Sequence, residues 1–301
     1  MSYVGLNGSV VRQDQAAVSV MDHGLLYGMG LFETFRTYNG IPFLLERHLK
    51  RLSDSCRLLG IHHQPDPVMI TGWLQQLMAA NGLSEAYVRY TVTAGEAPLG
   101  LPSGQYTAPA TLLFAKALPP LKAALYTEGR ALQLLSVTRN SPETPVRLKS
   151  LHYMNNVMAK RELDERNAAT GTQAEGLMLT ADGHVAEGIV SNVFFVKGNK
   201  LYTPEISTGV LPGITRAVVL ELAEELGVEA EEGRYRWGAL AGADEVFTTG
   251  SVQEIVPVTR LIDVEGASHR IGDGLAGPLT GKLLQAYRKK AGLYRHENNH
   301  L

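Results

Sequence analysis

The stretch RLKSLHYMNN, residues 147–156, places a lysine directly before a predicted helix. Lys149 follows a proline-containing loop, and the apolar spacing that comes after it predicts a helix over residues 153–169. A lysine nucleophile must first lose its proton, which burial or a neighbouring cation such as Arg147 favours. Most lysines lie in solvent, so position alone indicates only an ordinary surface residue here.

A second informative stretch, VAEGIVSNVFF, covers residues 185–195 and contains one carboxylate, Glu187. A carboxylate in this apolar strand context needs a partner, because an unpaired buried charge is costly. A protonated pyridine nitrogen would be such a partner. An exposed glutamate at the end of a strand needs none, and the spacing by itself favours that simpler interpretation.

Two hydroxyl-rich stretches are candidates for binding a phosphate. LPGITR, residues 211–216, opens a helix predicted over residues 214–226, and its first amides with the Thr215 hydroxyl suit an anion. Simple capping by Thr215 explains the same residues equally well. TTGS, residues 248–251, follows an apolar strand and supplies either further donors or only a polar turn.

Two stretches nearer the N-terminus are ambiguous. DHGLLYGMG, residues 22–30, precedes a strand, whereas a dinucleotide-binding fingerprint follows a strand and opens a helix. Such closely spaced glycines indicate a tight turn or the close approach of another segment. Arg51, on a helix predicted over residues 45–59, has the geometry to clamp a phosphate, although most basic residues on such a helix form its solvated face.

The composition narrows the classes of protein. Lys plus Arg (28) nearly balance Asp plus Glu (30), and no basic run indicates nucleic acid. The single cysteine, Cys56, suits a reducing compartment. Neither a leader-like N-terminus nor an apolar run of about 18 residues is present. We therefore expect a cytoplasmic protein with a small-molecule substrate, no membrane or nucleic-acid partner and, because no histidine has metal-ligand spacing, no metal.

Periodicity and turn signals predict an α+β protein. Hairpins are expected at Asn7-Gly8, Asn39-Gly40, Asp182-Gly183 and Gly198-Asn199. Helices are expected over residues 45–59, 67–80, 153–169, 214–226 and 279–290. The paired prolines 119 and 120 favour a linker, so we divide the chain into an N-terminal α+β domain (1–118), a linker (119–123) and a C-terminal domain (124–301).

Taken together, these motifs resemble the fold-type IV pyridoxal 5'-phosphate (PLP) enzymes, the family of branched-chain and D-amino-acid aminotransferases and aminodeoxychorismate lyase. The resemblance extends from the first hairpin to about Arg260. Its most specific pieces are Lys149-Ser150 with Asn155-Asn156, Glu187-Gly188 with Ser191-Asn192, residues 211–216, and Gly250-Ser251 with Glu254-Ile255 and Pro257. It implies a smaller N-terminal α/β domain, a larger C-terminal PLP-binding domain with a β-barrel-like core, and a homodimer.

The resemblance also implies roles for individual residues. Lys149 matches the Schiff-base lysine that moves a proton, Glu187 matches the carboxylate that pairs with the pyridine nitrogen, and Arg51 matches the phosphate-binding arginine. The remaining cofactor positions are Tyr153, Ser191, Asn192, Ile214, Thr215, Thr249 and Ser251. The substrate positions are Tyr27, Phe32, Tyr87 and Arg89, and Thr34 matches a position where a hydroxyl helps the leaving group.

Within the family, residues 22–36, 147–163 and 185–194 are most similar to bacterial aminodeoxychorismate lyases, which convert 4-amino-4-deoxychorismate to 4-aminobenzoate and pyruvate for folate synthesis. A branched-chain aminotransferase is the alternative, because Tyr27, Tyr87 and Arg89 also match its pocket. The D-amino-acid branch fits less well: residues 92–95 read VTAG where it has an arginine, a loss of about 1.5–3 kcal/mol in carboxylate binding. A second alternative is a protein that binds PLP without catalysis. Such a protein needs neither the proton transfer by Lys149 nor the electron-accepting ring that Glu187 supports.

Overall fold

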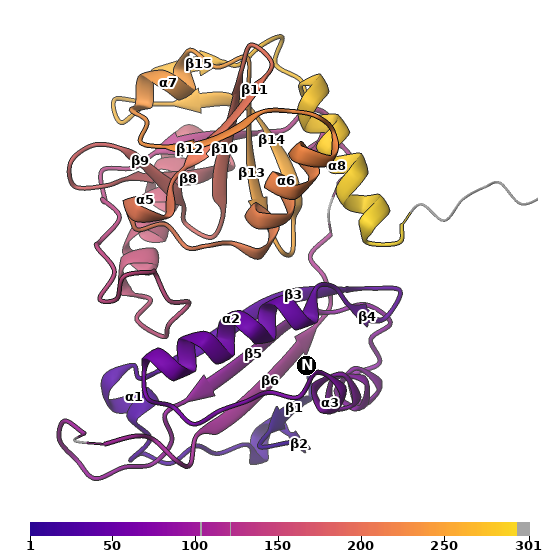
Figure 1. Cartoon of the computed structure of the whole chain (residues 1–301), viewed down its shortest axis with the longest axis vertical. Helices are drawn as coiled ribbons and strands as arrows, with labels where there is room; N and C mark the ends of the chain where they lie inside the picture. The colour runs from indigo at the N-terminus through magenta and orange to yellow at the C-terminus, as the bar shows by residue number, and fades with distance from the viewer. Residues whose placement is uncertain (103, 121, 294–301) are drawn as a thin grey trace, which may run out of the picture. The chain divides into compact units, whose positions relative to one another are not determined.

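Apolar side chains gather in separate cores on either side of residue 120, and the chain accordingly forms two units (Figure 1). The computed structural model describes residues 1–102, 104–120 and 122–293, so residue 121 of the predicted linker lies outside the described residues. The first unit contains Met1–Pro120 and also Leu148–His152, and the second contains the rest of the chain. The sequence predicted residues 148–152 in the C-terminal domain, whereas the structure groups them with the first unit.

The first unit is built on an antiparallel sheet of six strands in the order β2-β1-β6-β5-β3-β4. Its strands are β1 (Tyr3–Leu6), β2 (Ser9–Arg12), β3 (Gly30–Tyr38), β4 (Ile41–Pro42), β5 (Tyr87–Thr93) and β6 (Ala110–Lys116). The predicted hairpins at Asn7-Gly8 and Asn39-Gly40 are confirmed, and all four turn residues have the positive φ that such tight turns require.

Helices cover one face of this sheet. The unit contains α1 (His23–Tyr27), α2 (Leu45–Leu58), α3 (Pro67–Ala80) and the short helix η1 (Gln13–Gln15), and Figure 1 shows α2 running along the sheet. The core joins Leu49 of α2 and Leu74 of α3 to Phe35 of β3 and Val88 of β5. Because side chains alternate along a strand, the residues between these strand positions project from the opposite face.

The second unit contains a nine-stranded mixed sheet in the described part of the chain, in the order β12-β11-β10-β13-β14-β7-β8-β9, with β15 paired to β14. Its strands are β7 (Arg130–Leu134), β8 (Ala174–Leu179), β9 (Val185–Gly188), β10 (Asn192–Lys197), β11 (Lys200–Pro204), β12 (Ala230–Gly233), β13 (Glu245–Gly250), β14 (Glu254–Ile262) and β15 (Ser268–Arg270). Terminal strand β9 lies against β10 and β11 near the other end, so the sheet curls around its apolar core. The predicted barrel-like core is confirmed.

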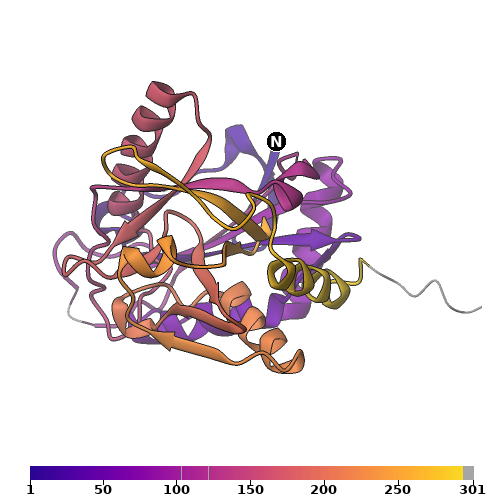
Figure 2. The ribbon, with the colours of Figure 1, turned by 90° about the horizontal axis from the view of Figure 1, so that it is seen from above.

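Helices of the second unit are α4 (Ala124–Thr127), α5 (Met154–Thr170), α6 (Ile214–Glu225), α7 (Trp237–Ala241), α8 (Pro278–Lys290) and the short η2 (Ile206–Thr208). Figure 2 shows α5 and α8 on opposite sides of this unit. All five predicted helices of the chain are present, with ends within one residue of the prediction. In the described ranges no helix has the length and apolar character needed to cross a membrane. The two-unit α+β fold is thus confirmed.

Candidate active site

The segment that carries Lys149 lies along the outer edge of β3. Phe32 N donates a hydrogen bond to the Lys149 carbonyl (2.9 Å), and Leu151 N donates to the Gly30 carbonyl (2.9 Å). Strand β4 pairs only with the far end of β3, so this part of the edge is open to the segment. Hydrogen bonds to a rigid sheet therefore fix the backbone of Lys149, although no regular helix or strand contains it.

The glycine-rich stretch at residues 22–30 makes room for this segment. A Cβ atom on Gly30 would lie 2.6 Å from Leu151 Cδ1 and 2.7 Å from the Val92 carbonyl oxygen. Gly28 has a φ of 67°, and a Cβ there would lie 2.4 Å from His152 Cδ2. His152 Nε2 is 2.9 Å from the Tyr27 carbonyl oxygen. The predicted close approach of another segment is confirmed, and that segment is the one carrying Lys149.

The Lys149 side chain packs on the sheet face that α2 and α3 leave uncovered. Its Nζ lies 4.7 Å from the centroid of the buried Phe32 ring, and Arg89 Cζ lies 3.6 Å from the same centroid. Arg89 stands directly opposite Thr34 in the β3–β5 register, and Tyr87 stands opposite Arg36 on the same face. The structure thus brings four predicted residues of the first unit, Phe32, Thr34, Tyr87 and Arg89, onto the face where Lys149 packs.

Tyr27 ends helix α1 and is held by backbone and aromatic contacts. Its hydroxyl accepts a hydrogen bond from Gly100 N (2.9 Å), and its ring meets His23 edge-on. The two ring nitrogens of buried His23 lie 2.8 Å from the Tyr106 hydroxyl and 3.0 Å from the Pro98 carbonyl oxygen. Both ring nitrogens of His23 are engaged by residues of the loop at 95–109, which is a structural role.

Arg51 is paired with a buried carboxylate. Its Nε and Nη2 donate to the two oxygens of Glu33 at 2.8 and 2.6 Å, and His48 Nδ1 lies 2.7 Å from Glu33 Oε2. Burial raises the pKa of Glu33, but Arg51 and His48 outweigh it and hold that pKa at about 2. Burial, partly opposed by Glu33, lowers the pKa of His48. Glu33 projects toward α2, so it fixes the orientation of the Arg51 guanidinium in the first unit.

Glu187 is buried in the second unit and accepts three hydrogen bonds. Arg139 Nε donates to Oε1 at 2.8 Å, while Asn192 Nδ2 (3.2 Å) and Leu211 N (2.8 Å) donate to Oε2. Only 5% of Glu187 is exposed, so the interpretation as an exposed strand-end glutamate is wrong. Arg147 Nε lies 3.9 Å from Oε1 and adds a second positive charge. Burial and then the Arg139 charge lower the pKa of Arg147 to about 10.

Arg139 connects Glu187 to the start of α5, a link that sequence reasoning missed. Its Nη1 donates to Asn155 Oδ1 (2.8 Å) and to Asn156 Oδ1 (3.2 Å). These amides in turn donate to the backbone carbonyls of Thr138 and Ile189. The sequence signal for Arg139 is its position just after an apolar stretch predicted as a strand. That position does not indicate which carboxylate Arg139 contacts.

Hydrogen-bond donors gather at the start of α6. Gly213 precedes the helix, and a Cβ there would lie 2.0 Å from Asn192 Oδ1, so only glycine fits. The first amides of a helix have no intrahelical acceptor. The Thr215 hydroxyl lies 3.5 Å from the Ser251 hydroxyl instead of capping the helix. Among the described residues, the buried Thr249 Oγ1 has no hydrogen-bond partner. We call the amides of residues 214 and 215 and the hydroxyls of Thr215, Thr249 and Ser251 the α6 donor cluster.

Two other predicted cofactor residues have ordinary local roles in the structure. Ser191 Oγ lies 3.2 Å from Glu175 Oε1. Tyr153 precedes α5, and its carbonyl accepts a hydrogen bond from Val157 N. No set of three or more His, Cys, Asp or Glu side chains in the described residues is arranged to bind a metal ion.

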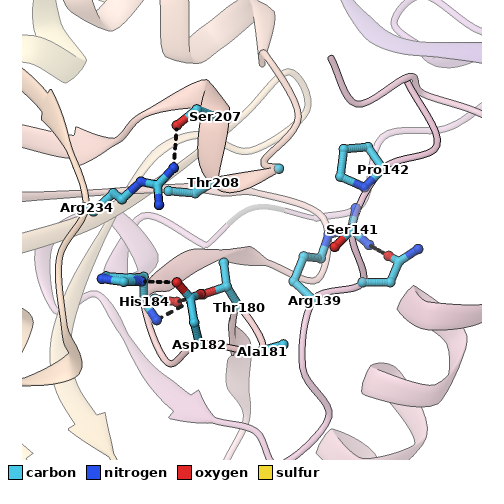
Figure 3. A pocket seen from close by; sticks show the side chains of 12 residues that line it. Arg139, Ser141, Pro142, Thr180, Ala181, Asp182, His184, Ser207, Thr208 and Arg234 are labelled. Carbon is cyan, nitrogen blue, oxygen red and sulfur yellow. Dashed lines mark hydrogen bonds and ion pairs between the residues drawn. The ribbon is translucent and has the colours of Figure 1, made fainter. Parts of the chain in front are cut away.

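A polar pocket of about 350 Å³ opens beside Arg139 in the second unit (Figure 3). Its lining includes Thr180, His184, Ser207 and Arg234, but none of the predicted site residues. Arg234 pairs with Glu205 at 2.8 Å and donates to Ser207, so it does not contact Glu187. Arg139 therefore lies between this pocket and the carboxylate.

Comparison with known proteins identifies the family. Residues 30–261 match the model of amino-transferase class IV, and the chain therefore belongs to this family of PLP-dependent enzymes. It is 40% identical to the aminodeoxychorismate lyase of Bacillus subtilis (strain 168) over 99% of this chain and 97% of the relative.

Two solved structures are similar over nearly their whole length. The 4-amino-4-deoxychorismate lyase from Pseudomonas aeruginosa superposes with a TM-score of 0.81 at 32% identity, covering 95% of this chain and 98% of that one. The branched-chain amino acid aminotransferase from Escherichia coli has a TM-score of 0.82 at 31% identity, covering 96% of this chain and 94% of that one.

The residues of the second unit fit the cofactor that this family implies. An unpartnered buried hydroxyl costs about 1–3 kcal/mol, so the Thr249 hydroxyl is suited to a ligand oxygen at the α6 donor cluster. A phosphate group offers such oxygens, and a helix start favours its negative charge. Glu187 accepts three hydrogen bonds at under 3.3 Å, and an ionised carboxylate has about four acceptor positions, which leaves room for one N–H.

Proposed function

We propose that this protein is a PLP-dependent 4-amino-4-deoxychorismate lyase that releases 4-aminobenzoate and pyruvate for folate synthesis. The observation that carries the proposal is the 40% identity to the Bacillus subtilis lyase over nearly the entire length of both chains. The relatives named as branched-chain aminotransferases match less closely, at 36% identity or below. The proposal assigns the substrate, whereas the family assignment fixes only the class of enzyme.

The family resemblance assigns several residues to the binding of the cofactor. Bound PLP supplies an aldehyde that takes up amines and a pyridine ring that accepts electron density from the substrate. Lys149 would hold the aldehyde carbon through Nζ, and the α6 donor cluster with Arg51 would hold the phosphate. Asn192 keeps Glu187 in place through its amide, and Tyr153 and Ser191 are the remaining expected contacts.

Two residues would control protons. Glu187 would hold a proton at the ring nitrogen, since the buried carboxylate has an unfilled acceptor position. Lys149 Nζ would remove the proton from the carbon that bears the substrate amine. It would hold this proton for a later transfer. Hydrogen bonds of the Lys149 backbone to β3 support this role, because a proton carrier must be held within hydrogen-bonding reach of the reacting carbon.

Substrate recognition is assigned to the sheet face on which Lys149 packs. Arg89 carries the positive charge suited to a substrate carboxylate, and Phe32 lies beneath its guanidinium as an apolar floor. Thr34 stands opposite Arg89 in the register and supplies the hydroxyl assigned to the leaving group. Tyr27 and Tyr87 complete the expected pocket.

A product assay tests the proposal directly. Purified protein loaded with PLP receives 4-amino-4-deoxychorismate, and 4-aminobenzoate and pyruvate are measured. A parallel sample receives leucine or D-alanine with 2-oxoglutarate, and glutamate is measured. We expect fast release of pyruvate and slow formation of glutamate. Fast formation of glutamate without 4-aminobenzoate would replace the lyase assignment by an aminotransferase.

The branched-chain aminotransferase is the second candidate. Two structures of Escherichia coli enzymes of that name have TM-scores of 0.82 and 0.80 to this chain, as high as the 0.81 of the lyase structure. Backbone similarity therefore does not separate the two activities, since substrate choice depends on side chains at the site and not on the fold. Leucine as amino donor discriminates between them in the assay above.

A further inference from the structure

The contact between Arg139 and Glu187 restrains the carboxylate that is expected to bind the cofactor ring. Arg139 is only 8% exposed, and its Nε lies 2.8 Å from Glu187 Oε1. Its other end is fixed, because Nη1 donates to the side-chain oxygens of both Asn155 and Asn156. A planar guanidinium held at both ends has little freedom to turn, and it restricts the carboxylate in the same way.

Resting on the proposed function, we propose that Arg139 is a positioning residue that keeps Glu187 ionised and aimed at the ring nitrogen of the cofactor. A proton shared by Glu187 and that nitrogen is repelled by the Arg139 charge. The repulsion is stronger when the proton sits on Glu187, because the guanidinium contacts the carboxylate directly and the ring lies farther away. The arginine therefore shifts the proton toward the ring, where it makes the ring a better acceptor of electrons.

The neighbouring arginine does not supply this contact. Arg147 Nε lies 3.9 Å from Glu187 Oε1, and its hydrogen bonds go to the carbonyl of Gly209 and to Asn140. The oxygen Oε2 is taken by Asn192 and by the Leu211 amide. Arg139 is thus the charged donor that bonds Oε1, and its removal leaves a carboxylate with hydrogen bonds on one oxygen only among those the structure describes.

The test compares three variants loaded with PLP labelled with 15N at the ring nitrogen. Arg139→Gln removes the positive charge. Arg139→Lys keeps the charge but lacks the planar guanidinium with its several N–H donors. Arg234→Gln is the matched control. Arg234 lines the same pocket (Figure 3) but pairs with Glu205. The 15N chemical shift reports whether the ring nitrogen carries a proton, and it is followed as a function of pH.

In wild type and Arg234→Gln we expect a protonated ring through the neutral range. In Arg139→Gln the shared proton should move from the ring nitrogen toward Glu187, so the 15N shift should approach that of an unprotonated ring already in the neutral range. The lyase kcat should fall about 10- to 100-fold, the range found when the partner that orients a metal ligand is removed. A ring that stays protonated over the same pH range as in wild type would overturn the proposal.

Two further results keep the inference separate from the proposed function. If wild type itself shows no absorption band from cofactor bound to Lys149, the proposed function is wrong. The inference is then wrong too, because it rests on that function. If Arg139→Gln does not fold, Arg139→Lys decides, because one ammonium cannot bond Glu187 and both asparagines in the same planar geometry. Wild-type 15N shifts and wild-type turnover in Arg139→Lys would then overturn the positioning role.

Discussion

At the scale of single residues, Lys149 is held by backbone hydrogen bonds and by a ring contact. Its backbone is bonded to β3 and its Nζ packs on Phe32. Lys149→Ala should abolish the cofactor absorption band and lower lyase turnover by about 10²–10⁴-fold from lost proton transfer alone. The matched control is Lys200→Ala, whose Nζ also packs on an aromatic ring but pairs with Glu229 and Glu231. An intact absorption band in Lys149→Ala would move the cofactor to another lysine.

Glu33 is expected to make the first unit sensitive to acid. Its pKa of about 2 in the folded protein is below the 4.5 of the free side chain, because Arg51 and His48 outweigh the effect of burial. A lowered pKa stabilises the folded state above pH 4.5, and this contribution is lost as the pH falls toward 2. From the two pKa values it amounts to about 3 kcal/mol.

The measurement is the free energy of unfolding of wild type and Glu33→Gln between pH 7 and pH 2.5. The difference between the two proteins should be large at pH 7 and should shrink steadily below about pH 4.5. The control is Asp14→Asn, which removes an exposed ion pair with Arg12 and should change little. A difference that is constant over the whole pH range would show that Glu33 is not ionised in the folded protein.

At the scale of elements, the edge of β3 is fitted to the Lys149 segment. A methyl group at Gly30 would lie 2.7 Å from the Val92 carbonyl oxygen and would push against Leu151. Gly30→Ala should therefore destabilise the protein by about 1–3 kcal/mol through overpacking and weaken PLP binding by displacing residues 149–151. Urea unfolding and a PLP titration measure the two effects.

Gly72→Ala is the matched control for the β3 edge. Gly72 lies within α3, and a Cβ there would meet no atom within 4 Å. The substitution should stabilise the helix by about 0.5–1 kcal/mol and leave PLP binding unchanged. Equal PLP affinity in Gly30→Ala and wild type would mean that the segment does not depend on this close approach.

Most helices and hairpins were predictable because their signals are local. The turn pairs Asn7-Gly8 and Asn39-Gly40 specify their own backbone conformation. Strand β14 was not predicted, and its Pro257 is unusual in a central strand. The structure resolves this: Pro257 lies opposite Phe247 of β13, and the parallel pairing with β7 begins only at Val258. A strand with neighbours on both sides over only part of its length tolerates a proline outside the doubly paired part.

The site was predictable only as far as its motifs are local. Glycines and hydroxyls at the start of α6 follow from the chain around them, and the resemblance supplied Lys149 and Glu187. The contact of Arg139 with Glu187 joins residues 48 positions apart, and the bridge between Leu31 and Ser150 joins two distant segments. No periodicity encodes such pairs, so they became visible only once the chain was folded.

At the scale of the whole molecule, the first unit exposes an apolar patch around α1. Val20, Met21, Leu25 and Leu26 are all exposed, and the largest fractions are 74% for Val20 and 68% for Leu25. Clustered exposed apolar side chains are typical of an interaction surface, whereas single ones are common on any protein. We use this patch to test the predicted homodimer, and the cytoplasmic location stays a prediction.

The substitution Leu25→Asp should weaken the dimer strongly. In a twofold-symmetric interface each change acts twice, and burying one leucine contributes about 1.5–3 kcal/mol, so the dissociation constant should rise about 10²- to 10⁴-fold. Size-exclusion chromatography with light scattering at several concentrations measures the mass. Val68→Asp is the control, because Val68 is 80% exposed in the first turn of α3, away in sequence from the patch. A wild-type mass of one chain at all concentrations would refute the dimer, and an unchanged dimer in Leu25→Asp would place its interface elsewhere.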